Sequence, residues 1–243
     1  MNHFTARGAI ASVGTLLVTA CLLAGCSAAP EPPASSTVAS KTPSATPTAT
    51  VDPIDTVVAL VARPEALELR DASGEVVVEL DYLGDVDAAI AAIERVLDEA
   101  PVDEEFRGSN HFPPSTAHRW GGFELWERRY VDRWADFETR ERTLGMPSFS
   151  VQFTGPEAVG VALLTEEGVV AGASWAELEA TPGLQSNPSG CSGPYLDYVT
   201  FDETWPDGTV HEARYGVDFT ASADESIVER VRAPLRVNQE GCA

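Results

Sequence analysis

The feature that most constrains this chain is the tract from Ser27 to Pro53, which consists mostly of Ala, Ser, Thr and Pro. It has no hydrophobic period, so it buries too little apolar surface to offset the entropy of ordering its backbone. We therefore predict a disordered tether over residues 26–54 and a single folded domain over 55–243. As a flexible coil the tract would span about 30 Å, and as extended polyproline II roughly 80 Å.

An apolar run from Ala9 to Leu23 precedes the tether, with Arg7 on its amino-terminal side. A basic start, an apolar core of about 7–15 residues and small residues before a cleavage site make up a secretory signal. The run ends in Leu23-Ala24-Gly25-Cys26, which resembles the lipobox of bacterial lipoproteins. The resemblance implies that residues 1–25 are a signal peptide and that cleavage occurs before Cys26.

The same resemblance implies a location. The sulfur of Cys26 would carry diacylglycerol, and its new amino group is a further site for acylation. Two acyl chains matter because one chain alone gives only marginal membrane binding. The protein is then expected on the extracytoplasmic face of the cell membrane. Two alternatives remain open, a plain signal peptide with a coincidental cysteine and a membrane-spanning helix. The helix would need about 20 apolar residues, more than this run supplies.

The chain is strongly acidic, with 16 Lys and Arg against 38 Asp and Glu and a formal net charge of −22. Such a charge repels phosphate backbones, so we expect no nucleic acid partner. It also keeps the folded domain away from anionic lipid, which leaves the acyl anchor as the expected membrane contact. The 44% of hydrophobic residues indicates a substantial core.

Hydrophobic periodicity predicts an α+β fold of antiparallel hairpins with two short helices. Residues 85–100 form the clearest helix, which Asp85 caps and Pro101 ends. A capping box at Ser174 and Glu177 predicts the second helix. Residues 227–237 fit either a strand or a short helix. Strands are expected at 56–62, 67–70, 76–80, 148–153, 159–164, 169–171, 195–204 and 209–220, with residues 106–116 as a loop and residues 159–171 as one hairpin.

One order of elements occurs twice: strand, Pro-Glu-Ala, strand, glycine turn, strand and helix. Pro64-Glu65-Ala66 and Pro156-Glu157-Ala158 occupy matching places. Few other residues agree, so the match is either chance or an old duplication. Our hypothesis is two related ββ(β)αβ halves, residues 55–145 and 146–243, in one body.

Cys191 and Cys242 are the cysteines that remain once Cys26 is lipidated and the signal peptide is removed. Two cysteines outside the cytoplasm are typical of one disulfide. Closing a loop of about 50 residues would contribute about 4 kcal/mol on the entropic model. A reactive or metal-bound pair is the alternative, although no histidine lies near either cysteine in the sequence.

The aromatic segment from Trp120 to Phe137 is the main candidate for a binding site. Its aromatic residues have helical spacing, yet Gly121-Gly122 is a poor helix start and residues 123–127 fit a strand equally well. The aromatic side chains are either core or a platform for a sugar or a protein. The interleaved arginines favour an anionic ligand or acidic partner; they are Arg119, Arg128, Arg129 and Arg133. The candidate binding residues are His118, Trp120, Trp126, Arg129, Tyr130 and Trp134.

Motifs that carry catalysis are not found in this sequence. It has no Gly-x-Ser-x-Gly motif and no phosphate-binding glycine loop, and Tyr215 stands where a second histidine would complete a metalloprotease motif with His211-Glu212. We therefore predict no catalytic residues, no cofactor and no metal. The favoured function is non-catalytic binding, or a structural role, in the cell envelope, with a glycan or protein partner. The alternative is a hydrolase of wall glycan or peptide that uses carboxylates or His118.

Overall fold

The computed structural model describes residues 51–109, 112–130, 142–204 and 208–237. The predicted signal peptide, Cys26 and most of the tether lie outside these residues. The chain divides into two units, Met1–Thr48 and Ala49–Ala243, and every element described below belongs to the second. No helix in the described ranges has the length and apolar character needed to cross a membrane.

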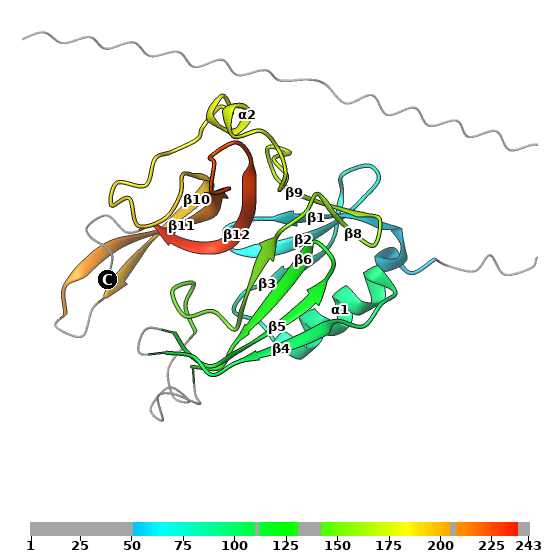
Figure 1. The fold of residues 1–243 in the computed structure, drawn as a ribbon. Coiled ribbons are helices and arrows are strands. Elements are labelled where there is room, and N and C mark those ends of the chain that lie inside the picture. The colour runs from blue at the N-terminus through cyan, green and yellow to red at the C-terminus, as the bar shows by residue number, and fades with distance from the viewer. Residues whose placement is uncertain (1–50, 110–111, 131–141, 205–207, 238–243) are drawn as a thin grey trace, which may run out of the picture. The chain divides into compact units, whose positions relative to one another are not determined.

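Two β-sheets make up the second unit, as Figure 1 shows. The five-stranded sheet has the order β3-β2-β1-β9-β8, and the seven-stranded sheet has the order β10-β11-β12-β7-β6-β5-β4. The first sheet contains β1 (Val57–Ala62), β2 (Ala66–Asp71), β3 (Val76–Asp81), β8 (Glu157–Ala158) and β9 (Val161–Thr165). The second contains β4 (Val102–Phe106), β5 (Ser115–Trp120), β6 (Phe123–Arg128), β7 (Phe149–Phe153), β10 (Tyr195–Thr204), β11 (Val210–Ala221) and β12 (Val228–Val237). β1 and β9 are parallel, and the other pairs are antiparallel.

The helices of the described residues are α1 (Val86–Leu97), α2 (Trp175–Glu179) and the 3-10 helix η1 (Pro53–Thr56). Asp85 caps α1 by accepting a hydrogen bond from the backbone N–H of Asp87 at 3.0 Å. At α2 the side chain of Glu177 accepts from the backbone N–H of Ser174 at 3.3 Å, as the predicted capping box requires. The described part of the chain is thus mostly β-sheet with two α-helices, and the predicted hairpin-rich fold with two helices is confirmed at this level.

One hydrophobic core joins both sheets and α1. Leu67 of β2, Ile93 of α1 and Phe153 of β7 are each completely buried in it. In the seven-stranded sheet, inward side chains alternate with polar ones, so Phe123 and Leu125 face this core while their neighbours point to the other face. We call that other side the outer face of the seven-stranded sheet.

The predicted hairpin between residues 159–164 and 169–171 is wrong. β9 pairs instead with β8 and, in parallel, with β1, and residues 169–171 form no strand. The reason lies in the backbone bonds that follow: Gly172 donates to the carbonyl of Val228 at 2.8 Å, and Val228 donates to the carbonyl of Ala173 at 2.9 Å. These bonds direct the chain toward β12. Val228–Val237 form that strand, so the choice left open for residues 227–237 falls on the strand.

Candidate functional site

The aromatic segment begins as a strand and not as a helix. β5 and β6 form a tight hairpin in which Trp120 opposes Phe123 and Ala117 opposes Trp126. Because strand side chains alternate between faces, Trp120 and Trp126 lie on opposite sides of the sheet. Phe123 and Trp126 lie on opposite sides for the same reason, so the helical stripe that their spacing suggests is not formed within the described residues.

Three of the predicted binding residues are buried. The Trp120 side chain is 1% exposed, and its indole N–H donates to the Glu99 carbonyl at 2.8 Å. His118 is buried, with Nδ1 2.8 Å from an oxygen of Asp103. Tyr130 is also buried, and burial raises the pKa of its hydroxyl. Of the two interpretations of the aromatic side chains, core or binding platform, the first is correct for Trp120.

Arg129 and Trp134 complete the set of candidates. The Arg129 guanidinium pairs with Glu105 at 2.7 Å and with Glu127 at 3.1 Å, on the side of the sheet opposite Trp126. Trp134 lies outside the described residues. The structure thus separates the predicted candidates, and Trp126 alone among the described ones lines a cavity on the outer face.

Trp126 lines a cavity of about 700 Å³ on the outer face, which we call the outer groove. The groove crosses β4, β5, β6, β7 and β12, so it brings together residues more than a hundred positions apart in the sequence. Four arginines from three strands line it, although the chain as a whole is acidic. The groove is defined by Phe106, Arg119, Trp126, Arg128, Gln152, Arg230 and Arg232.

The indole of Trp126 is fixed from several directions. Its ring lies 4.9 Å from the ring of Phe106, centroid to centroid, and the guanidinium carbons of Arg119 and Arg128 lie 5.9 and 5.2 Å from its centroid. Its N–H donates to Glu124 at 2.8 Å. The small residue Ala117 stands opposite on β5, which leaves room for the indole.

Glu124 is the carboxylate that organises the groove. It is 8% exposed, and it accepts hydrogen bonds from Arg119 at 2.9 Å, from Trp126 at 2.8 Å and from Gln152 at 2.9 Å. Both oxygens are therefore occupied by groove side chains. Hydrogen bonds to Glu104 and Glu124 raise the pKa of Arg119, which is thus neutralised within the site.

Arg128 differs from the other arginines of the groove. Its guanidinium donates to two neutral hydroxyl groups, of Ser150 at 3.2 Å and of Ser115 at 3.5 Å. Within the described ranges no carboxylate pairs with it. Burial lowers the pKa of Arg128, and the neighbouring charge of Arg232 lowers it further. The groove thus contains a desolvated positive charge that the described residues do not neutralise.

Arg232 supplies a second guanidinium from β12. It binds the fully buried Asp218 of β11 through Nε at 3.0 Å and through a closer contact of Nη2. Burial raises the pKa of Asp218 in spite of this pairing. Arg230, two residues earlier on the same face, is 44% exposed and stands 3.7 Å from Glu229.

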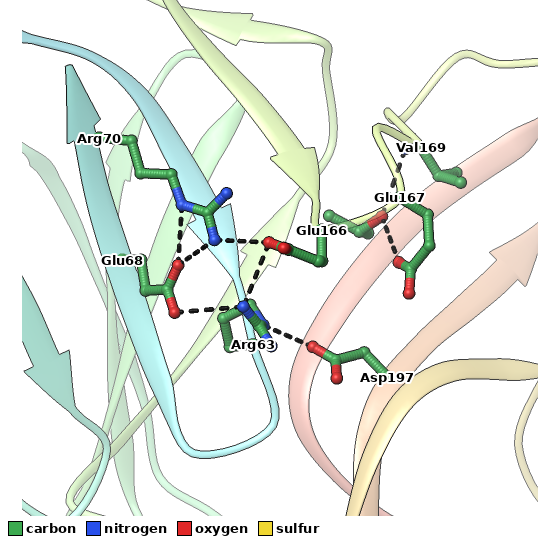
Figure 2. A network of polar contacts seen from close by, with 8 residues as sticks. Arg63, Glu68, Arg70, Glu166, Glu167, Val169 and Asp197 are labelled. Atoms are coloured by element: carbon green, nitrogen blue, oxygen red, sulfur yellow. Dashed lines mark hydrogen bonds and ion pairs between the residues drawn. The ribbon is translucent and has the colours of Figure 1, made fainter. Parts of the chain in front are cut away.

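A second cavity, of about 520 Å³, lies between β2, β3 and β10, and Arg63 is on its wall. Figure 2 shows the Arg63 guanidinium surrounded by carboxylates: Asp197 at 2.5 Å, Glu166 at 3.1 Å and Glu68 at 3.3 Å. Arg70 joins the same network through Glu68 and Glu166. These contacts connect the five-stranded sheet with β10, so this network links the two sheets and leaves no positive charge on Arg63 unpaired.

Two further predictions concern cysteines and metals. Cys191 is disulfide-bonded, while its predicted partner Cys242 lies outside the described residues. In the part of the chain that the structure describes, no three His, Cys, Asp or Glu side chains are grouped to hold a metal ion. His118 Nε2 has no hydrogen-bond partner in these ranges, so no nucleophile is held against it there.

Comparisons with protein-family models, curated proteins and solved structures give no match to this chain.

Proposed function

We propose that this chain is a lipid-anchored protein of the cell envelope that binds an anionic envelope component in the outer groove without converting it. The membrane contact would be the acyl chains of Cys26, and residues 26–54 would hold the folded unit away from the bilayer on the extracytoplasmic side. The binding surface would be the arginine- and aromatic-lined outer groove.

The observation that carries this proposal is Arg128. A desolvated guanidinium without a carboxylate costs stability, because a buried charge is normally paired. Ionisable groups whose pKa is shifted by burial and by neighbouring charges cluster at functional sites. Arg128 borders an open cavity beside Trp126, and an incoming anion would satisfy both the charge and the unused donors.

Two variants test the binding proposal in the full chain, purified in mild detergent. Glucuronate, glucose 6-phosphate and N-acetylglutamate serve as simple anionic probes, and equilibrium dialysis measures their binding. We expect at least one probe to bind, and Arg128→Met to weaken it at least tenfold. Arg95→Met is the matched control, since Arg95 is exposed on α1 and pairs with Asp52 and Asp55. The proposal fails if no probe binds, or if Arg128→Met binds as well as the unchanged chain.

A separate variant tests the anchor. Cys26→Ala removes the only sulfur that the lipobox resemblance would lipidate, so the chain should move from the membrane fraction to the soluble fraction on cell fractionation. Retention of Cys26→Ala in the membrane fraction would contradict the lipid anchor and leave the groove proposal untouched.

The proposal also includes the duplication and the cystine. In each proposed half, 55–145 and 146–243, a helix is followed by a three-stranded antiparallel meander of the seven-stranded sheet. The correspondence is weaker at the first strands, since β1 and β7 belong to different sheets.

For the cystine, Cys242 is the proposed partner of Cys191. A Cys191–Cys242 cross-linked peptide in an unreduced digest would support this pairing, and a different partner would refute it.

A further inference from the structure

The lining of the outer groove limits which anion it accepts, and this inference rests on the proposed function. We propose that the ligand is a sugar ring that bears a single carboxylate, as hexuronates do. The carboxylate would lie on Arg128, and the ring would lie against the aromatic side of the groove near Trp126.

Charge is the first reason. The groove itself contains Glu104 and Glu124, and the chain carries a net charge of −22. These carboxylates pair with Arg119, and Arg232 pairs with Asp218. A phosphate dianion, or a polyanion with one charge per unit, would therefore bring more negative charge than Arg128 alone can offset. A single carboxylate matches the one guanidinium that lacks a carboxylate partner, and its two oxygens fit the planar fork of Arg128.

The neutral polar side chains of the groove are the second reason. β7 contributes Ser150 and Gln152 to the lining, and Thr154 follows directly after it, beside the strands that carry Arg128 and Arg232. Each of these side chains already has one partner, since Ser150 accepts from Arg128, Gln152 donates to Glu124 and Thr154 donates to the Gly122 carbonyl. Each also has a further donor or acceptor position, which a carboxylate on an alkyl chain would cover without a hydrogen bond. A ring with several hydroxyl groups can pair with them, so a sugar acid fits better than a fatty acid.

The aromatic side chains are the third reason. Phe106 and Trp126 form a tilted pair in the lining of the groove, and Phe112, which is 64% exposed, also lines it. Such surfaces favour a ligand with one apolar and one polar side. A pyranose ring has C–H groups on one side and hydroxyl groups around its edge, which matches the aromatic pair and the polar side chains in and directly after β7.

Four ligands distinguish the possibilities by isothermal titration with the full chain in mild detergent. They are a disaccharide that contains one glucuronate, its neutral counterpart with glucose in that place, glucose 6-phosphate and hexanoate. We expect the uronate disaccharide to bind at least tenfold more tightly than each of the others. Arg128→Met should reduce its affinity to that of the neutral disaccharide, while Arg95→Met should leave it unchanged.

The outcomes separate this inference from the proposed function. If glucose 6-phosphate or hexanoate binds as tightly as the uronate and loses its affinity in Arg128→Met, the sugar-acid inference is overturned while anion binding stands. Equal binding of the uronate and the neutral disaccharide also overturns the inference. If no anion binds in a manner that depends on Arg128, both fail.

Discussion

Replacing Arg128 by methionine should stabilise the protein while it weakens ligand binding at least tenfold. Methionine keeps most of the volume of the arginine stem, so the variant removes the charge without opening a large cavity. A residue retained for folding would show the opposite effect on stability. The sign of the change therefore separates a functional guanidinium from a structural one.

The magnitude follows from the contacts of Arg128. Methionine loses one good hydrogen bond, to Ser150 at 3.2 Å, which contributes about 1 kcal/mol. It also loses the cation–π contact with Trp126, about 0.5–1 kcal/mol, part of which a sulfur–aromatic contact replaces. The charge of Arg128 acts in the opposite direction, because a desolvated ion without a carboxylate partner lowers the free energy of unfolding by several kcal/mol. This cost is smaller in a groove that admits water. The net expectation is a stabilisation of about 1 kcal/mol.

Urea unfolding followed by circular dichroism measures this difference, and a thermal melt should show an increase in Tm of about 2–4 °C. Arg95→Met, an exposed control, should change the free energy of unfolding by less than about 0.5 kcal/mol. Arg232→Met should instead destabilise by about 3–5 kcal/mol, because it leaves the buried carboxylate of Asp218 unpaired. A destabilisation of 2 kcal/mol or more in Arg128→Met would refute the reasoning.

Three further predictions concern folding. Arg63→Met should destabilise by about 2–4 kcal/mol in urea unfolding, because it leaves the part-buried carboxylates around it without their shared cation; an unchanged midpoint would contradict this. Gly193→Ala should cost at least 4 kcal/mol or prevent folding, since a Cβ there would lie 1.7 Å from the carbonyl oxygen of Phe219, and a near-normal melt would contradict it. The raised pKa of Asp218 means that the folded state takes up its proton more readily than the unfolded chain. As the pH falls from that raised pKa through 3.8, the ordinary value of the carboxyl, the free energy of unfolding of the unchanged protein should increase relative to that of Asp218→Asn. A difference in free energy of unfolding between the two proteins that stays constant from pH 7 to pH 4 would contradict this.

Local signals in the sequence predicted much of the fold. The apolar stripe and the Asp85 cap identified α1, and the turn between β2 and β3 and the one between β10 and β11 identified two hairpins. β4 was not predicted, because its sequence is mostly acidic and exposed and carries no clear alternation. The parallel pairing of β1 with β9 was also missed, since about a hundred residues separate the partners and no turn residue marks the contact.

The candidate site was predicted only in part. Spacing placed Phe123 and Trp126 on one helical stripe, whereas a strand turns them to opposite faces, one into the core and one into the groove. Arg230 and Arg232 were missed because they reach the groove through the pairing of β12 with β7. The alternation of Glu124, Trp126 and Arg128 was a usable signal, since three polar or amphipathic side chains in alternate positions indicate one solvent-facing side of a strand.

The most direct test of the account is whether a ligand touches Arg128. Nitrogen-15 NMR spectra of the arginine Nε–Hε groups, recorded while the uronate disaccharide is added, report this contact, and Arg128→Met assigns the signal by its loss. The account predicts a saturable shift of the Arg128 signal, with the Arg95 signal unmoved. Saturable binding of the disaccharide that leaves the Arg128 signal in place would contradict it.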